Sequence, residues 1–284
     1  MVSWNRVVRP SDGLVESPPV EDGSRPGAQY PSVMVFDHAH LPYVFAASLA
    51  ALLIGLSKGG LSMLGSLATP VFALVASPVS AAAILLPILV VSDLFGLWSY
   101  RKEFDRRNLA ILIPAGIAGV AIGWATASIV SDRAVGLMIG VIGIAYCLNT
   151  WRLRHRKPAP RRADVPRGAF WGAVMGFSSF ISHTGGPPFQ VYVLPQQLPK
   201  LVFAGTATIV FAALNMAKLL PYWMLGQFST SNIEASLLLM PIAIAGAFAG
   251  VRLVRVLPER IYYLFVQTML WIVSIKLILD AADI

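Results

Sequence analysis

The sequence predicts an all-α polytopic membrane protein made of two repeats with inverted topology. Three observations predict this fold: long apolar segments, a shortage of charged residues, and motifs of one half that return in the other. Of the 284 residues, 56% are hydrophobic and 13% are charged. A soluble domain carries about 25% charged residues, so most of this chain should contact lipid. The long, continuous apolar segments favour helices over the short alternating strands of a barrel.

The composition divides the chain into four regions. Residues 1–40 are rich in Pro, Gly, Ser and charge and lack apolar periodicity, so we expect a disordered N-terminal tail. Residues 41–152 form the first expected transmembrane repeat, and residues 168–280 form the second, inverted one. Between them, residues 153–167 form a basic linker, whose charge predicts a cytoplasmic position.

Each repeat should consist of a broken-helix hairpin followed by three long transmembrane helices. The first two apolar segments of each half are short, and Gly59-Gly60 and Gly185-Gly186 separate them. Since glycine and proline interrupt helical hydrogen bonding, each pair should fold as a hairpin whose tip lies within the membrane. Whether eight or ten segments span the bilayer stays open. The segments cover residues 41–57, 61–76, 79–99, 108–130 and 133–152, then 168–182, 187–195, 201–222, 231–251 and 260–279.

An internal repeat relates the two halves. The Asp132-Arg133 pair is followed, 127 positions later, by Glu259-Arg260. Several matches in one register indicate a repeat. The glycine pairs among them predict faces for close helix packing. Three further residues return at the same spacing of 127: Pro114, Gly119 and Gly123 in the first half, Pro241, Gly246 and Gly250 in the second.

The charges of the loops predict that the two repeats are inverted. In the first half, the loop at 101–107 is basic and the turn at 131–133 is nearly neutral. In the second half, the corresponding loop at 223–231 has no charge, whereas the next turn contains Arg252, Arg255 and Arg260. Basic loops stay in the cytoplasm, so the helices that follow the two loops should run in opposite directions. We expect a multi-pass protein of the cell inner (plasma) membrane.

The two glycine breaks are expected to meet inside the membrane and to form a site for a small anionic ligand. Inverted repeats of broken helices place binding sites near the bilayer midplane. Backbone N–H groups at a helix N-terminus attract anions, and glycine allows a ligand to approach the backbone closely. The expected binding residues are Ser57, Lys58, Gly59, Gly60, Ser182, His183, Thr184, Gly185, Gly186 and Gln190.

Lys58 and His183 are the titratable groups at the two breaks. An ammonium group at membrane depth is costly unless it faces an anion, a carboxylate or water. Lys58 could instead snorkel to the interface if the hairpin tip is shallow. His183 could bind the anion, carry a coupling proton, or only hydrogen bond a carbonyl of the broken helix.

Asp93, Asn215 and Lys218 are further candidates, for coupling or for an ion pair. Asp93 lies about two helical turns before the basic loop, deep enough to need a partner. Lys58 or Lys218 could be that partner, and the alternative is a purely structural ion pair. Lys218 stands close to an interfacial aromatic group at 221–223, so its side chain is expected to snorkel.

No sequence feature requires a cofactor, a metal ion or a nucleic acid. The net charge of +8 comes from short basic segments between apolar ones, as the positive-inside rule expects, and not from a nucleic-acid surface. The single cysteine, Cys147, lies in an apolar segment, which rules out a disulfide within one chain or a cysteine-based metal site. The sequence contains no Gly-x-x-x-x-Gly-Lys-Ser/Thr loop for ATP.

The chain resembles the sulfite exporter TauE/SafE family, a family of sulfonate-uptake-type membrane permeases. The resemblance implies a secondary transporter of small anions, often sulfur-containing ones such as sulfite, sulfonates or sulfoacetate. Membrane lipids and a small anion would then be its partners, with a possible coupling proton. The substrate, the direction of transport and the oligomeric state stay open. The likeness rests on Gly55-Leu56-Ser57-Lys58-Gly59-Gly60, Leu67-Ala68-Thr69-Pro70-Val71 and the stretch from Gly176 to Gln190.

Two other classes of function are weighed against a transporter. A membrane-embedded enzyme could use His183 and a serine, but the sequence has neither a His-Glu-x-x-His motif nor a nucleophile elbow. An anion channel or a scaffold is the third possibility. A saturable flux that counter-anion stimulates would separate a carrier from a channel, and a complete lack of flux would favour a scaffold.

Overall fold

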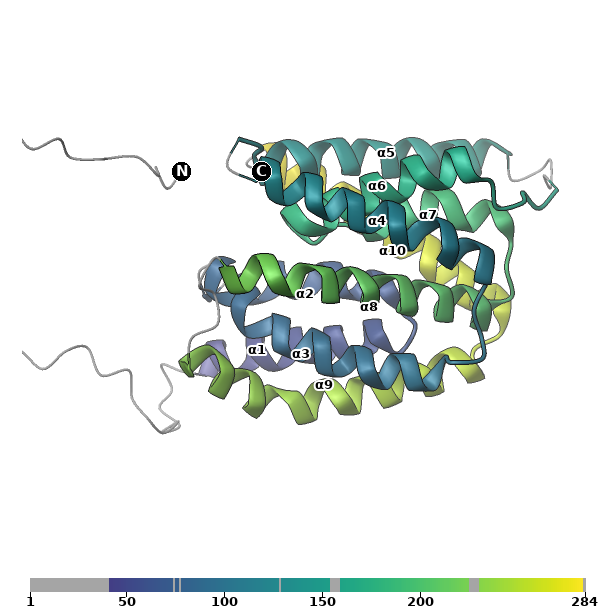
Figure 1. Cartoon of the computed structure of the whole chain (residues 1–284). Helices are drawn as coiled ribbons and strands as arrows, with labels where there is room; N and C mark the ends of the chain where they lie inside the picture. Colours follow the sequence, from purple (N-terminus) through teal and green to yellow (C-terminus); the bar gives the residue numbers. More distant parts are fainter. Residues whose placement is uncertain are drawn as a thin grey trace, which may run out of the picture. The chain divides into compact units, whose positions relative to one another are not determined.

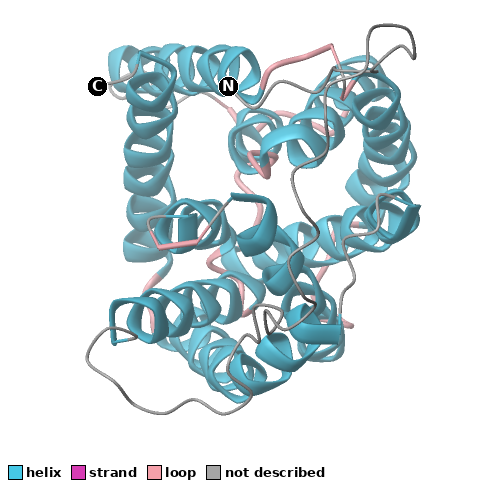
Figure 2. Cartoon of the chain, turned by 90° about the vertical axis from the view of Figure 1, so that its left-hand side faces the viewer, coloured by secondary structure: helices cyan, strands magenta, loops and turns pink. Residues whose placement is uncertain are grey.

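The computed structural model describes residues 41–73, 75–76, 78–127, 129–153, 159–224 and 230–282. All regular structure in these residues is helical, as Figure 2 shows, which confirms the predicted all-α class. The disordered tail expected for residues 1–40 and the centre of the expected linker lie outside the described residues.

The first half contains a broken hairpin and three long helices. The hairpin consists of α1 and α2, which a single 3-10 turn, η2 (Ser62–Leu64), connects. The long helices start close to the expected positions. The helices are α1 (Leu41–Lys58), α2 (Gly65–Ala73), α3 (Pro78–Ser99), α4 (Arg106–Thr126) and α5 (Asp132–Leu153).

The second half repeats this order. Its hairpin ends in a second 3-10 turn, η3 (Leu194–Gln196). The first helix begins at Val165, within the stretch expected to be linker, because Asp164 caps it: the carboxylate accepts a 3.0 Å hydrogen bond from Arg167 N. The helices are α6 (Val165–Ser182), α7 (Gly186–Val193), α8 (Lys200–Met224), α9 (Thr230–Val256) and α10 (Glu259–Ala282).

Six helices within the described residues are long and apolar enough to cross a membrane: α1, α4, α5, α8, α9 and α10. Large apolar side chains such as Leu237, Leu238 and Leu264 remain mostly exposed on them, as lipid-facing residues do. The apolar stretch Ile84–Ser99 of α3 is shorter. The chain is therefore a multi-pass membrane protein.

The repeated glycines bring helices of the two halves into close contact. A Cβ on Gly250 of α9 would lie 2.8 Å from Leu56 O of α1, and one on Gly123 of α4 would lie 3.1 Å from Phe180 Cβ of α6. Gly119 and Gly246 pack in the same way on these two helix pairs. The glycine pairs are thus helix-packing faces, as predicted.

The last helices of the two halves, α5 and α10, lie side by side at the top of Figure 1. Gly140 of α5 packs against Ile278, whereas Gly143, one turn later, packs against Ser274, so the two helices run antiparallel. The α1–α9 contact has a counterpart in the α4–α6 contact. An inverted repeat would require this packing, and the inversion itself remains a prediction.

Candidate functional site

The two glycine breaks lie against each other around one small cavity, which we call the central cavity. Its volume is about 60 Å³, room for a few water molecules or one small ion. A Cβ on Gly186, at the second break, would lie 2.6 Å from Met63 Sδ, just after the first break. The polar or small residues that line it are Ser57, Lys58, Ser62, Gly65, Ser66, Ser179, His183, Gly186, Thr208, Asn215 and Lys218.

The first break is held by two tyrosines. Gly60 adopts φ +108°, a left-handed conformation that favours glycine. The hydroxyl of Tyr100, just after α3, donates a 2.6 Å hydrogen bond to Gly59 O, and the hydroxyl of Tyr262 in α10 donates a 3.0 Å bond to Gly60 O. Both tyrosines are fully buried. The break is therefore fixed by side chains from elements distant in sequence.

The expectation of a backbone anion cradle at the first break is wrong. The N–H groups of Gly59, Gly60 and Leu61 donate to carbonyl oxygens within α1, at 2.9 to 3.2 Å. Gly59 also packs closely on α9, since its Cβ would lie 2.6 Å from Gly250 Cα. The structure thus places Gly59 and Gly60 behind the cavity wall, where they shape the break.

At the second break, α6 ends at Ser182, and the next residue, His183, adopts a left-handed conformation with φ 54°. His183 and Gly186 line the central cavity. Ser182 and Thr184 do not line it; their hydroxyl oxygens lie 2.7 Å apart and face a different cavity. Pro187 and Pro188 have no N–H to offer a ligand. The two prolines therefore remove backbone donors that a helix N-terminus would otherwise offer here.

Like Gly59, Gly60, Ser182 and Thr184, the expected binding residues Gln190 and Gly185 do not line the central cavity. Gln190 is fully buried, its side-chain oxygen and nitrogen form no hydrogen bond within the described residues, and it does not line the central cavity. Gly185 packs against α6 and α8, with Ser179 Cβ 2.9 Å and Phe211 3.1 Å from the position of an added Cβ. Neither residue is therefore placed to contact a ligand in the central cavity.

Lys58, in the wall of the central cavity, forms a buried ion pair with Asp93. Lys58 Nζ lies 2.6 Å from Asp93 Oδ1, with side chains 6% and 0% exposed. Asn215 Nδ2 donates a 2.7 Å hydrogen bond to the other oxygen, Asp93 Oδ2. Asp93 thus has the lysine partner that its depth requires, and the ammonium of Lys58 does not snorkel.

Lys218 also points inward. Its ammonium donates a 2.7 Å hydrogen bond to Ser179 Oγ of α6, and the residue is 1% exposed. The expectation that Lys218 snorkels to the interface is wrong, because α8 turns this position toward α6 and the cavity and not toward lipid. It contributes a second buried ammonium group to the cavity wall.

Thr208 belongs to the site but was missed from the sequence. It is buried and lines the central cavity, and Thr208 Oγ1 has no hydrogen-bond partner within the described residues. The signal was present in its spacing from Phe211, Asn215 and Lys218, which follow at three, seven and ten residues and so share one face of α8.

Two other cavities lie at opposite ends of α5 and α10. The basic-end cavity, about 980 Å³, is lined by the end of α5 and the start of α10 together with Arg161 and Arg167. The opposite-end cavity, about 270 Å³, is lined by the start of α5 and the end of α10. The first lies beside the predicted cytoplasmic linker. The second lies toward the other side of the predicted membrane.

A row of aromatic rings separates the central cavity from the basic-end cavity. Phe211, in the wall of the central cavity, lies 5.6 Å from Phe189, which in turn lies 5.6 Å from Phe203. Phe203 contacts Tyr263, in the wall of the basic-end cavity, at 5.7 Å. Phe189 and Phe203 are fully buried. This aromatic row thus runs from the wall of the central cavity to the wall of the basic-end cavity.

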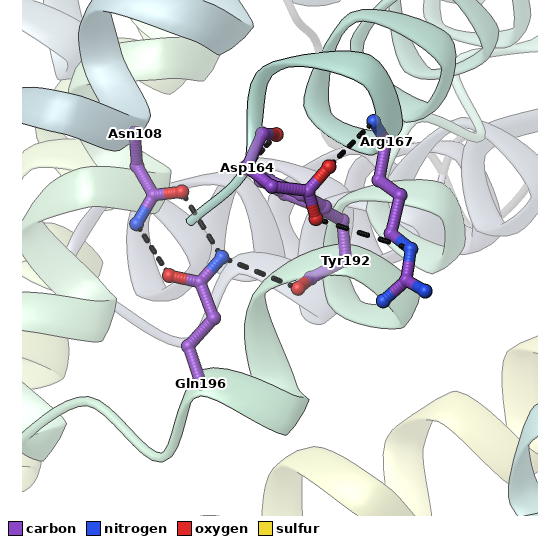
Figure 3. Close-up of polar contacts among 5 residues, drawn as sticks. All are labelled: Asn108, Asp164, Arg167, Tyr192 and Gln196. Carbon is purple, nitrogen blue, oxygen red and sulfur yellow. Dashed lines mark hydrogen bonds and ion pairs between the residues drawn. The ribbon is translucent and has the colours of Figure 1, made fainter. Parts of the chain in front are cut away.

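Beside this row, a polar network ties the two halves together at the basic end (Figure 3). The side-chain amides of Asn108 in α4 and Gln196 in η3 exchange two hydrogen bonds, at 2.8 and 3.1 Å. Gln196 also donates to Tyr192 O, and the Tyr192 hydroxyl donates to Asp164 O at 3.0 Å. No periodic pattern in the sequence predicts this contact. It fixes the second hairpin to the start of α4.

Comparison with known proteins agrees with this architecture. Residues 47–277 match the family described as sulfite exporter TauE/SafE. The matched region contains both glycine breaks and every residue that lines the central cavity. No curated protein and no solved structure matches the chain significantly. The chain belongs to the sulfite exporter TauE/SafE family.

Proposed function

We propose that the protein is a secondary transporter that binds one small anion in the central cavity and moves it by alternating access. The observation that supports the proposal is the charge at the wall of this cavity: Lys58 and Lys218 both line it, whereas Asp93, the carboxylate beside it, pairs with Lys58 alone. Family membership supports the same conclusion, because it implies membrane transport of anions.

The charge argument follows from the cost of burying ions. Lys58 and Asp93 neutralise each other at 2.6 Å, and Asn215 satisfies the remaining carboxylate oxygen. Lys218 has a hydroxyl partner, Ser179, which carries no charge. A buried ammonium without a counter-charge is unfavourable, and an anion in the cavity would compensate it. The site therefore fits a ligand with one negative charge.

The size and polarity of the cavity narrow the substrate class. About 60 Å³ admits a small oxyanion but no lipid or peptide. The hydroxyl groups of Ser57, Ser62 and Thr208 offer donors to the oxygens of such an anion. We propose a sulfur oxyanion or a small sulfonate, in line with the description of the family. His183 or Asp93 would carry a coupling proton.

Alternating access is supported by the arrangement of the cavities. The buried rings of Phe189 and Phe203 lie between the central cavity and the basic-end cavity, and we infer that they close the path between the two cavities. Inverted repeats, if present as the sequence predicts, would provide a second packing of similar energy that opens this side. A carrier is therefore favoured over a channel.

An enzyme is the less favoured alternative. Hydrolysis by a His183–serine pair would need a carboxylate that orients the histidine. Asp93, the carboxylate that pairs with Lys58 of the cavity wall, has its two oxygens facing Lys58 and Asn215. No such catalytic arrangement supports an enzymatic function.

The experiment that tests the proposal measures transport by the purified full-length chain in liposomes. Sulfite, sulfate, thiosulfate, methanesulfonate and acetate are each supplied outside the liposomes, with and without a pH gradient. We expect saturable uptake of at least one sulfur-containing anion, stimulated when the same anion is loaded inside. Uptake that neither saturates nor responds to internal anion would indicate a channel. The absence of any flux, with folded protein present, would refute the transporter.

A further inference from the structure

The ion pair of Lys58 and Asp93 lies where a ligand in the central cavity can open it. Lys58 lines the cavity, and Asp93 of α3 lies 2.6 Å from its ammonium. Apart from this ion pair, Asp93 Oδ1 has no hydrogen-bond partner within the described residues, whereas Asn215 donates to Oδ2. An anion that draws Lys58 toward the cavity therefore leaves Oδ1 buried without a partner.

The charges at the cavity decide which anion has this effect. With Asp93 ionised, the two ammonium groups of Lys58 and Lys218 leave one positive charge uncompensated. An anion with one negative charge neutralises this charge, and Lys58 stays paired with Asp93. An anion with two negative charges would leave one negative charge uncompensated in a buried site, which is costly.

Asp93 can remove that charge by taking up a proton. Its helix, α3, packs against α1, α2, α8 and α9. Lys58 of α1 and Lys218 of α8 face the central cavity, and the sequence of α2 contains no charged residue. His183 is the other titratable group of the cavity wall, and the test below separates it from Asp93. The charged residues of α9 are exposed; they are Glu234, Arg252 and Arg255.

We propose that Asp93 lets the central cavity bind a divalent oxyanion together with one proton, and a monovalent oxyanion without a proton. The divalent anion draws Lys58 away, and Asp93 Oδ1 takes a proton from water that enters with the anion. Asn215 donates to Oδ2 in both states. The loaded cavity is then neutral with either anion. The role of this coupling in transport rests on the proposed function, whereas the coupled binding is a property of the site alone.

The test compares two tetrahedral sulfur oxyanions, methanesulfonate with one negative charge and sulfate with two. Both stay ionised near neutral pH, so any proton taken up belongs to the protein, whereas sulfite itself titrates there. Calorimetric titration of the purified full-length chain in detergent, in buffers of different ionisation enthalpy, gives the protons taken up per anion. We expect about one proton per sulfate and about none per methanesulfonate. The affinity for sulfate should then fall about tenfold per unit of rising pH, while that for methanesulfonate stays constant.

Two variants assign the proton to Asp93. Asp93→Asn cannot be protonated, so it should bind sulfate without proton uptake and without dependence on pH. Glu234→Gln, which removes an exposed carboxylate of α9, is the matched control and should keep the proton uptake. Because Asp93→Asn leaves Lys58 unpaired, the double variant Asp93→Asn with Lys58→Met provides a second test. It retains only the charge of Lys218 and should prefer methanesulfonate to sulfate, with no proton taken up for either.

The outcomes separate this inference from the proposed function. Equal proton uptake with both anions overturns the inference, and so does sulfate binding without a proton. Uptake that survives Asp93→Asn also overturns it, because the proton would then reside on another group, such as His183. Any of these results in a chain that transports anions leaves the proposed function in place. Sulfate binding coupled to one proton through Asp93, in a chain without any flux, would support the inference and refute the transporter. Failure of both anions to bind would overturn the inference together with the proposed site.

Discussion

Lys58, the last residue of α1, lies 2.6 Å from the carboxylate of Asp93 in α3, and both side chains are buried. The pair joins the first glycine break to the long helix that follows its hairpin. Because Asn215 of α8 binds the other oxygen of Asp93, the carboxylate connects elements from both halves at one point. Any anion that enters the central cavity competes with Asp93 for Lys58. The ion pair is therefore placed where substrate binding can be coupled to a change in helix packing.

Replacement of Lys218 tests the charge argument most directly. Lys218→Met keeps the length of the side chain and removes the ammonium that has no carboxylate partner. We expect loss of anion uptake in liposomes while the protein remains folded, because a buried ammonium without a counter-charge contributes little or nothing to stability. Lys102→Met, in an exposed loop, is the matched control and should transport normally. Normal uptake by Lys218→Met would remove this residue from the site.

Asp93→Asn should destabilise the protein, because it leaves the buried Lys58 without its counter-charge. Breaking a buried pair by removal of one partner costs about 3–5 kcal/mol. The double variant Asp93→Asn with Lys58→Met removes both charges and should recover much of that stability. Thermal unfolding in detergent measures both effects. If the double variant were no more stable than Asp93→Asn alone, the charge imbalance would not be the cause.

Gly60→Ala tests the geometry of the first break. At φ +108° an alanine is strained, and its Cβ would collide with the Tyr100 hydroxyl, which holds Gly59 O. We expect a loss of about 1–3 kcal/mol in unfolding free energy. Gly136→Ala, in the helical body of α5, has room for the methyl group and is the matched control. Equal stability of the two variants would show that the tyrosine-held break is not rigid.

The aromatic row is expected to keep the central cavity closed toward the basic end. Phe189→Leu replaces the aromatic ring that contacts both Phe211 and Phe203 with a smaller aliphatic side chain. We expect a leak, seen as uptake that depends less on internal anion, together with lower stability from the space left in the core. Phe170→Leu, an exposed ring at the start of α6, provides the comparison. Tight, fully counter-stimulated uptake by Phe189→Leu would contradict a gating role.

The helices, both hairpins and the glycine packing faces could be predicted because each depends on local patterns: apolar length, glycine breaks and a fixed repeat spacing. Lys58 lies in the wall of the central cavity beside the first break, and its role in binding stays a prediction. Gly59 and Gly60 were assigned to the ligand although their backbone groups are already bonded. Tyr100 and Tyr262 bond their carbonyls from 41 and 202 residues away. No single-sequence pattern encodes such pairings.

Lys218 also shows that neighbours in the sequence do not determine which way a side chain points in the fold. Its neighbourhood in the sequence is aromatic and interfacial, which favours snorkelling, but its position on α8 in three dimensions faces Ser179 of α6. The spacing of Thr208, Phe211, Asn215 and Lys218 carried the missing information, because it places all four on one helical face. This shared helical face predicts that both Thr208 and Lys218 point toward the cavity.

The amide pair of Asn108 and Gln196 yields the last prediction, since it joins residues 88 positions apart and both are buried. Asn108→Leu leaves the Gln196 amide without two partners, which should cost about 1–3 kcal/mol in thermal unfolding. The double variant Asn108→Leu with Gln196→Leu replaces both amides by apolar groups and should recover part of this loss. Because the pair joins α4 to the end of the second hairpin, we also expect each single variant to raise leak of anion through liposomes. A leak with unchanged stability would place the effect on gating alone, whereas no change in either measurement would show that the pair is dispensable.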